Sequence, residues 1–303
     1  MSTEVNIIVV GKSKAIIRSA ARAGFKEISR VEDIMSAYKP DSELCSLNKT
    51  GKSEKKLSKE LLYVINKARY ASELSGGAFD ITCKPLIDLW HNAKKSKELP
   101  DEQNISDALS LVGSKDISTK NNNVKFNKVG MKIDLGALAK GYAVDMAINL
   151  IKKYDIQGAL VDAGGDIRAI GRREDGKPWE IGIKHPREKD KIIGLINLKN
   201  NAVATSGDYE RFFMLNGKRY SRIIDPRTGY PINNQIVSVS VLSKDCLTCD
   251  SLATVIVVLG EKKGMELIEK LKDVEALIIT IKDGNINLLK SSGLANFKPV
   301  FGL

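Results

Sequence analysis

Four aspartates stand out as residues whose setting could support chemistry. Asp80, Asp134 and Asp166 each lie beside glycines, and Asp250 lies four positions before Thr254, so that on a helix these two side chains would share a face. Carboxylate and hydroxyl oxygens suit Mg²⁺ or Ca²⁺, whereas zinc sites favour His and Cys. The residues therefore indicate a hard-cation site, although Asp beside Gly is also common in plain turns.

The stretch 132–142 gives one of these aspartates a setting. Ile133 and Leu135 alternate with polar neighbours, which predicts a short half-buried strand, and helical spacing begins at Ala139. Asp134 would then end a strand just before a helix start with free, partly positive N–H groups. Such a start can hold a phosphate or its cation, whereas in a plain connection Asp134 would only cap the helix. The stretch thus points to a pyrophosphate ligand and Mg²⁺-dependent nucleotide chemistry.

The elements that must position these residues mix helices and strands. Helices are predicted over 12–37, 58–74, 139–154 and 249–259. Most segments between 158 and 289 alternate like half-buried antiparallel strands. We find no internal repeat, low-complexity tract or linker. The sequence therefore predicts one intertwined α+β domain over residues 1–303, with mainly antiparallel sheets flanked by helices.

Composition excludes several other classes. The net charge is +11, but the basic residues are dispersed and aromatics make up only 6%, so we expect a solvated lysine-rich surface and no nucleic-acid partner. Cys246 and Cys249 form a CxxC pair with no second pair, so neither a zinc site nor a disulfide scaffold is expected. No apolar run approaches the roughly 20 residues that span a bilayer, and residues 1–10 do not resemble a signal peptide.

A series of motifs then follows in order along nearly the whole chain. They are Met35-Ser36-Ala37-Tyr38 with Asp41-Ser42-Glu43-Leu44 and Asn48; Gly77-Ala78-Phe79-Asp80-Ile81-Thr82 with Pro85-Leu86 and Leu89-Trp90; Asp134-Leu135-Gly136 with Ala139-Lys140-Gly141-Tyr142 and Asp145; Gly164-Gly165-Asp166-Ile167-Arg168; Thr205-Ser206-Gly207; Ile224-Asp225-Pro226-Arg227-Thr228-Gly229; and Asp250 with Ala253-Thr254. In this order the motifs resemble the ApbE family, the FAD:protein FMN transferases.

The resemblance implies a fold and a reaction. The fold is α+β and related to the T-fold. The reaction uses Mg²⁺ to split FAD, passes FMN to a threonine or serine hydroxyl of an acceptor protein and releases AMP. The acceptor is typically a membrane electron-transfer subunit with an Asp-Gly-x-Thr-type motif, and some members instead hydrolyse FAD to FMN and AMP. Family members are usually periplasmic or lipid-anchored, but this chain carries no export signal, so a cytoplasmic place stays open.

The resemblance also assigns site residues. FAD contacts are expected at Met1, Tyr38, Ala78, Phe79, Asp80, Asp134, Lys140 and Ile224. The metal would be held by the Asp250 carboxylate, the Thr254 hydroxyl and the Ala137 carbonyl oxygen. Tyr38 would pack on an aromatic ring of the cofactor, although an ordinary tyrosine at a helix end has the same sequence signature.

Three further positions qualify the resemblance. Asp166 and Arg168 are expected to be structural and to form a buried ion pair. At the catalytic position where the family normally has a histidine, this chain has Arg222, and arginine cannot act as a base near neutral pH. Arg222 could still neutralise pyrophosphate charge. Three alternatives follow: another base such as a nearby aspartate, an engineered substitution, or an FAD-binding protein with weak turnover.

Overall fold

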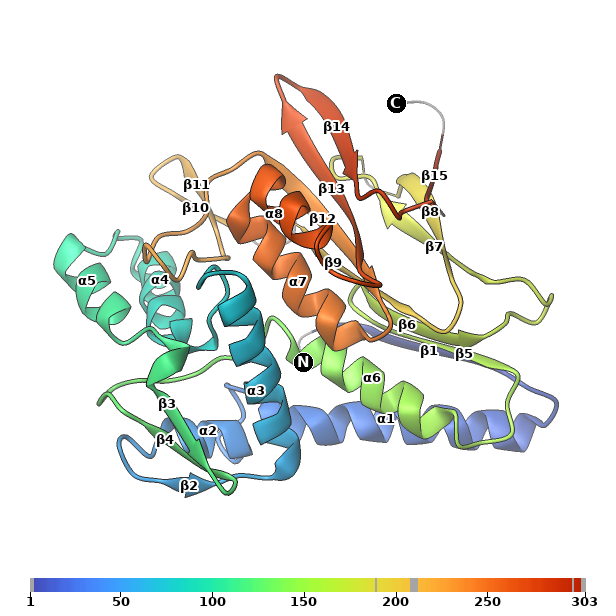
Figure 1. The fold of residues 1–303 in the computed structure, drawn as a ribbon, viewed down its shortest axis with the longest axis horizontal. Coiled ribbons are helices and arrows are strands. Elements are labelled where there is room, and N and C mark those ends of the chain that lie inside the picture. Colours follow the sequence, from blue (N-terminus) through green and yellow to red (C-terminus); the bar gives the residue numbers. More distant parts are fainter. Residues whose placement is uncertain (1–2, 189, 208–211, 296, 301–303) are drawn as a thin grey trace. The chain divides into compact units, whose positions relative to one another are not determined.

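The computed structural model describes residues 3–188, 190–207, 212–295 and 297–300. The chain divides into two units, each assembled from separated segments (Figure 1). The first unit comprises Met1–Glu32, Leu138–Tyr209 and Gln235–Leu303, and the second comprises Asp33–Ala137 and Glu210–Asn234. Both mix helices with antiparallel strands, which confirms the predicted α+β class.

The first unit is built on a seven-stranded sheet in which every neighbouring pair is antiparallel. Its strands, in spatial order, are β1 (Val5–Val10), β5 (Gly158–Ala163), β6 (Asp166–Gly171), β9 (Ala202–Gly207), β12 (Ile236–Ser243), β13 (Glu275–Lys282) and β14 (Asn285–Lys290). All eight residues of β12 are buried, as expected for a central strand covered on both faces.

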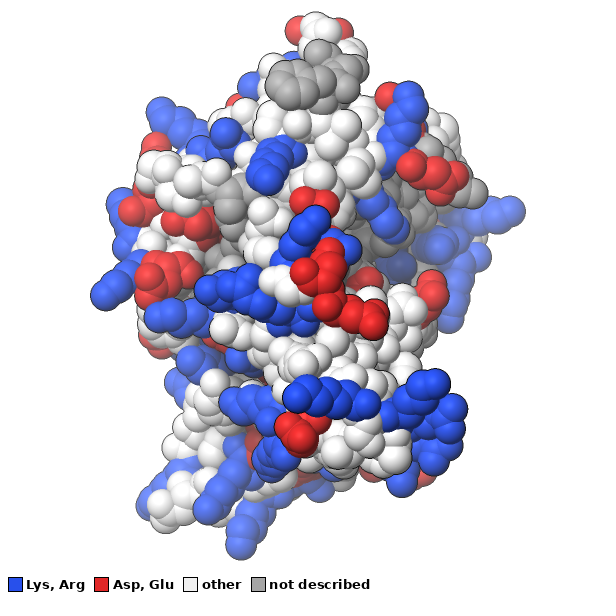
Figure 2. All heavy atoms as spheres, turned by 90° about the vertical axis from the view of Figure 1, so that its right-hand side faces the viewer, with Lys and Arg blue, Asp and Glu red and all other residues white. Residues whose placement is uncertain are grey.

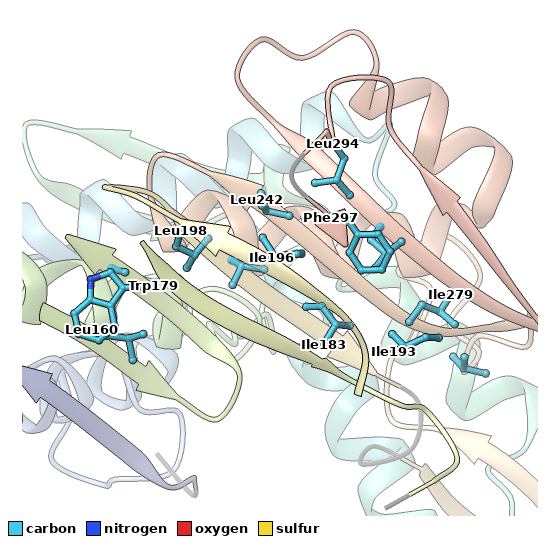
Figure 3. Close-up of a cluster of buried hydrophobic side chains, with 14 residues drawn as sticks. Leu160, Trp179, Ile183, Ile193, Ile196, Leu198, Leu242, Ile279, Leu294 and Phe297 are labelled. Carbon is cyan, nitrogen blue, oxygen red and sulfur yellow. The ribbon is translucent and has the colours of Figure 1, made fainter. Parts of the chain in front are cut away.

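Helices and a small sheet cover this main sheet. Helices α6 (Ala139–Ile151) and α7 (Cys246–Leu259) pack on each other and on the strands β5, β6, β9 and β12, and α8 (Glu261–Ile268) packs on α7. The long helix α1 (Lys14–Met35) also begins in this unit. The small sheet contains β7 (Trp179–Lys184), β8 (Ile192–Leu198) and β15 (Phe297–Pro299), and its side chains meet those of the main sheet in one hydrophobic cluster (Figure 3).

The second unit contains more helix than strand. Its elements are α2 (Glu43–Asn48), α3 (Lys59–Leu74), η1 (Ile81–Cys83), α4 (Lys84–Ser96), α5 (Glu102–Ser110), η2 (Ser114–Asp116), a small sheet of β2 (Lys55–Lys56), β3 (Ile117–Lys120) and β4 (Asn123–Phe126), and a hairpin of β10 (Phe212–Leu215) and β11 (Lys218–Ser221). Trp90 of α4 packs among Leu86, Phe213 and Ile224, and its indole N–H donates to the Gly229 carbonyl over 2.8 Å. This core joins α4 to the hairpin.

Local signals account for both ends of α3 and for the start of α7. The Ser58 side chain accepts a hydrogen bond from the backbone N–H of Leu61 and starts α3, and Gly76 and Gly77 follow that helix with φ of 59° and 82°. Helix α7 begins three residues earlier than predicted, at Cys246, because the Asp245 side chain caps it through the N–H of Thr248.

The predicted strand in the stretch 132–142 is wrong. Ile133 and Leu135 are buried as the alternation indicated, but the stretch pairs with no strand among the described residues. Its backbone instead bonds to single groups, since the N–H of Ile133 donates to the Asn48 side chain and the N–H of Asp134 donates to the Ile81 carbonyl. Asp134 therefore lies in an irregular, well-anchored segment that precedes α6.

The surface charge and the helices bear on two expectations from the composition, namely dispersed basic residues and no apolar segment long enough to span a bilayer. On the face shown in Figure 2, Lys and Arg side chains are scattered, with Asp and Glu side chains among them. This matches the dispersed basic residues of the sequence. None of the described helices combines the length and apolar character needed to cross a bilayer.

Candidate functional site

Helix α7 carries the two side chains expected to bind a metal. Asp250 and Thr254 lie one turn apart on this helix, with 2% and 9% of their surfaces exposed. The helix is apolar on nearly every side and is therefore buried almost completely, so its polar residues are held inside the protein. The third expected ligand, the carbonyl oxygen of Ala137, belongs to the second unit and lies two positions before the start of α6 in the sequence.

The carboxylate of Asp250 is anchored by α6. Its Oδ2 accepts a hydrogen bond from the backbone N–H of Gly141 over 3.2 Å, and the Lys140 ammonium lies 3.3 Å from both of its oxygens. Lys140 also forms a close ion pair with Asp166. Burial, followed by the neighbouring charge of Asp250, raises the pKa of Asp166 well above its usual range, against the attraction of Lys140. One ammonium is thus shared by the carboxyl groups of Asp166 and Asp250.

The hydroxyl of Thr254 provides a direct test of whether these residues suit Mg²⁺. Its Oγ1 is buried and has no hydrogen-bond partner among the described residues. A buried hydroxyl without a partner is unfavourable unless a ligand, water or ion satisfies it. The described part of the chain holds no cluster of three or more His, Cys, Asp or Glu suited to a metal. Because Mg²⁺ often takes only one or two protein carboxylates and completes its shell with waters and phosphates, Asp250 and Thr254 fit this ion.

Charged residues of the second unit surround Tyr38. This residue exposes 71% of its surface, and the Lys84 ammonium lies 5.4 Å from the centre of its ring. Lys84 is itself buried and forms an ion pair with Asp88 one turn along α4. The charges of Asp134 and Arg222 also act on the Tyr38 phenol. An exposed aromatic ring held over a fixed cation can stack against a flat ligand.

The two carboxylate oxygens of Asp134 differ in their contacts. Its Oδ1 accepts from the N–H of Gly136 over 2.7 Å, whereas Oδ2 is buried and has no partner among the residues that the structure describes. Burial raises the pKa of Asp134, and the Gly136 N–H and the Lys84 charge oppose this rise. Asp134 therefore closes a local turn at Gly136 rather than capping α6, whose first residue is Ala139.

Other predicted FAD contacts have side chains that the protein uses itself. Ala78 and Phe79 are 1% and 3% exposed. Asp80 accepts hydrogen bonds from Thr82, Ser114 and Ser72 and begins the short helix η1. A ligand at Ala78, Phe79 or Asp80 would thus meet mainly backbone. The same holds for Ile224, because its side chain packs in the core beside Trp90.

Met1 and Arg222 are the remaining predicted site residues. Met1 lies outside the described residues. Arg222 is exposed, directly follows β11 and forms no ion pair within the described ranges. It lies near enough to Tyr38 for its charge to act on the phenol.

The expected ion pair between Asp166 and Arg168 is wrong. Asp166 pairs with Lys140, and Arg168 donates from Nη1 to Oδ1 of Asp145 over 2.7 Å. The reason is geometric: Asp166 and Arg168 are two positions apart on β6, so both face α6 rather than each other. Both are structural, as expected, but they form two parallel links between β6 and α6.

Sequence reasoning missed a stripe of polar residues on α4. Lys84, Asp88 and His91 recur at positions i, i+4 and i+7, which places them along one side of the helix. Partial burial lowers the pKa of His91, and so do the charges of Lys95, Lys94 and Arg222. These effects favour the neutral form of the imidazole. The helical spacing was visible in the sequence, but nothing there indicated that the stripe lies beside Tyr38 and Arg222.

Comparisons with known proteins place this geometry in context. The ApbE family pattern matches residues 1–278. An FAD:protein FMN transferase of Vibrio cholerae is 35% identical over 276 residues, covering 90% of this chain and 81% of that protein, and one of Haemophilus influenzae is 34% identical, covering 85% and 78%. Among solved structures, the flavin transferase ApbE from Vibrio cholerae gives a TM-score of 0.84 at 32% identity, covering 98% of this chain and 96% of that one. The ApbE protein of Thermotoga maritima gives 0.86 at 35%, covering 96% and 94%.

Proposed function

The chain belongs to the ApbE family, and on this basis we propose that it transfers FMN from FAD to a threonine or serine hydroxyl of an acceptor protein and releases AMP with the help of Mg²⁺. It is an enzyme, a transferase that moves flavin from FAD to a protein. The metal, the acceptor residue and the leaving group are the proposed parts.

The bonds in this reaction balance as follows. The hydroxyl oxygen of the acceptor attacks the phosphorus on the FMN side of the FAD pyrophosphate and forms a phosphoester. The bond from that phosphorus to the bridging oxygen breaks, and AMP leaves with this oxygen. The hydroxyl proton passes to a base. Charge builds up on the phosphate oxygens during the transfer, so the site must place positive charge beside them.

The observation that carries the proposal is the Thr254 hydroxyl, which has no partner within the part of the chain that the structure describes and lies one turn from the buried Asp250 carboxylate. These oxygens, with the carbonyl of Ala137, would hold the metal. A bound Mg²⁺ would supply charge neutralisation on the pyrophosphate. Gly141 and Lys140 hold the Asp250 carboxylate by a hydrogen bond and by charge, so its orientation is fixed before any ligand arrives.

The remaining proposed contacts bind and orient FAD. Tyr38 would stack on an aromatic ring of the cofactor over the Lys84 ammonium. Asp134 would accept a hydrogen bond at its free Oδ2. Ala78, Phe79, Asp80 and Ile224 would contribute backbone groups, Lys140 would meet phosphate, and Met1 would complete the set.

Arg222 favours a second candidate function. Because a guanidinium stays protonated, Arg222 would stabilise pyrophosphate charge but take no proton from the acceptor. Asp134 and the neutral imidazole of His91 are other proton acceptors of the second unit. If neither reaches the acceptor hydroxyl, water would compete for the phosphorus. The chain would then act as an Mg²⁺-dependent FAD pyrophosphatase that yields FMN and AMP, or bind flavin with weak turnover.

We propose the acceptor to be a membrane electron-transfer subunit with an Asp-Gly-x-Thr-type segment, met in the periplasm or another extracytoplasmic space by a lipid-anchored full-length form. We also propose that residues 1–303 act as one domain, because each unit interrupts the other in the sequence.

Incubation with FAD and Mg²⁺, with and without a protein that carries such a segment, tests the proposal. A transferase releases AMP in step with FMN-labelled acceptor, detected by mass spectrometry. Matched controls use EDTA and an acceptor whose threonine is replaced by valine. Free FMN and AMP without acceptor would indicate the pyrophosphatase, and FAD binding without any AMP would contradict both enzymatic readings.

A further inference from the structure

Helix α7 is held in place from outside by a carboxylate of α6. Asp145 is 4% exposed, and its Oδ1 and Oδ2 accept hydrogen bonds from the backbone N–H groups of Cys246 and Leu247 over 2.9 and 3.0 Å. These are the first two residues of α7. The N–H of the third, Thr248, is satisfied by the cap residue Asp245. Asp145 thus satisfies the two backbone N–H groups at the start of α7 that the cap residue Asp245 does not bind.

The same carboxylate is fixed from β6. The Nη1 of Arg168 donates to Oδ1 of Asp145 over 2.7 Å. A carboxylate that accepts from two helix N–H groups and one guanidinium has its orientation set on three sides. It also lies at the positive end of the α7 dipole, where a negative charge is favourable. Rotation of α7 about its axis, or sliding along it, would break these bonds.

A second contact, one turn away on α6, involves the proposed metal ligand. Gly141 lies so close to α7 that a Cβ atom at this position would be 2.3 Å from the carbonyl oxygen of Cys246. This approach lets the N–H of Gly141 reach Oδ2 of Asp250. Asp145 and Gly141, four positions apart on α6, thus contact α7 at its start and at Asp250 respectively.

We infer that Asp145 is a positioning residue, which, held by Arg168, fixes the start of α7 and thereby sets where Asp250 stands. The inference rests on the proposed function for its effect on metal binding, but not for the effect on α7 itself. Burial raises the pKa of Asp145 to about 6, against Arg168 and the two N–H groups. Keeping a buried carboxylate ionised at neutral pH opposes folding, so we attribute to Asp145 the placement of α7 rather than a gain in stability.

Asp145→Asn is the variant that tests the inference. It keeps the volume and one acceptor oxygen but loses the charge that two N–H groups and Arg168 share. Ser291→Ala is the matched control, because it removes a buried hydroxyl of the same unit whose hydrogen bonds go to Ala276 and Glu275 rather than to α6 or α7. Circular dichroism and thermal unfolding establish first that both variants are folded.

Hydrogen exchange of the α7 amides is the readout that does not depend on metal. We expect the first turn of α7 to lose protection in Asp145→Asn and to keep it in Ser291→Ala. Unchanged exchange in Asp145→Asn would overturn the inference, whatever the enzyme proves to do. If Asp145→Asn does not fold, Arg168→Gln serves instead, with a smaller loss expected at the same amides.

Titration with Mn²⁺ as the probe metal gives the second readout. We expect Asp145→Asn to bind Mn²⁺ roughly 10–100-fold more weakly than the wild type, and Ser291→Ala to bind it equally well. Below about pH 6, where Asp145 takes up a proton, the difference in Mn²⁺ affinity between the wild type and Asp145→Asn should shrink, because protonation of other groups such as Asp166 affects both proteins alike. The charged groups that face Asp145 are Arg168 and Asp245, and the thiols of Cys246 and Cys249 beside it stay neutral.

The outcomes separate the inference from the proposed function. Faster exchange with unchanged Mn²⁺ affinity would overturn the link from Asp145 to the metal ligand. A wild type that binds no Mn²⁺ at all would instead contradict the proposed metal site, and the exchange result alone would then decide whether Asp145 positions α7.

Discussion

The backbone N–H of Gly141 donates to Oδ2 of Asp250 over 3.2 Å, across a contact between two helices that leaves no room for a side chain on Gly141. This hydrogen bond links the stretch 132–142 to α7, the helix that carries the proposed metal ligands Asp250 and Thr254. The position of Asp250 therefore depends on how closely α6 and α7 approach each other.

Gly141→Ala tests this contact. The added methyl group would be 2.3 Å from the Cys246 carbonyl oxygen and 2.9 Å from Cα of Leu247, both backbone atoms that cannot rotate away. We expect a loss of about 1–3 kcal/mol in the free energy of unfolding, measured with urea, together with weaker Mg²⁺-dependent activity. Gly11→Ala is the control for the backbone effect of removing a glycine, because its φ also lies outside the left-handed region and an added Cβ would make only ordinary contacts at 3.5–3.6 Å. Equal stability of Gly141→Ala and the wild type would contradict the tight contact.

Thr254→Val separates function from stability at the proposed metal site. Valine has nearly the shape of threonine and removes a buried hydroxyl that has no partner among the described residues. We expect the free energy of unfolding without metal to stay equal or to rise by up to about 1–2 kcal/mol, while activity at limiting Mg²⁺ falls about 10–100-fold. Chemical unfolding and a Mg²⁺ titration of AMP release measure the two effects. Full activity of Thr254→Val would show that its hydroxyl holds no metal.

Arg222→His asks whether a base is missing. A histidine here could accept the proton of the acceptor hydroxyl, so we expect FMN transfer to rise by up to about 10²–10⁴-fold, with a smaller change in FAD hydrolysis. Arg222→Gln is the matched variant, because it removes the charge without adding a base. Both rates follow from AMP release with and without acceptor. If Arg222→His and Arg222→Gln behave alike, the idea of a missing base is wrong.

The stability of the wild type relative to Asp145→Asn should depend on pH with a defined sign. Because burial raises the pKa of Asp145 from 3.8 to about 6, the folded state holds its proton more tightly than the unfolded chain. The stabilisation from protonated Asp145 is therefore complete below about pH 4 and is lost as the pH rises through about 6. We expect the difference in unfolding free energy to shift by roughly 1–3 kcal/mol between pH 4 and 7. Urea unfolding of both proteins over this range measures it, and a flat difference would contradict the raised pKa.

Much of the fold followed from local signals in the sequence. The cap at Ser58 and the glycine pair after Leu74 gave the ends of α3, and helical spacing gave α1 and α6. The burial of Ile133 and Leu135 was also correct. Their strand was not, because alternation reports which side chains are buried but not which partner the backbone finds.

The site was harder to predict from the sequence than the fold, because its contacts join residues that lie far apart in the chain. Asp250 and Thr254 share α7, which spacing alone predicted. The bonds from Asp145 to Cys246 and Leu247 cross about a hundred positions, and no local pattern encodes such contacts. Asp166 likewise found its partner in Lys140 on α6, since the neighbouring helix rather than the next charge on its own strand decided the pairing.

A crystal structure with Mn²⁺ and a non-hydrolysable FAD analogue, read by the anomalous signal of the metal, tests the central claim most directly. We predict one Mn²⁺ bound by the carboxylate of Asp250, the hydroxyl of Thr254 and the carbonyl oxygen of Ala137, with the pyrophosphate of the analogue completing its shell. A metal held elsewhere, or a pyrophosphate bound away from these oxygens, would contradict the account.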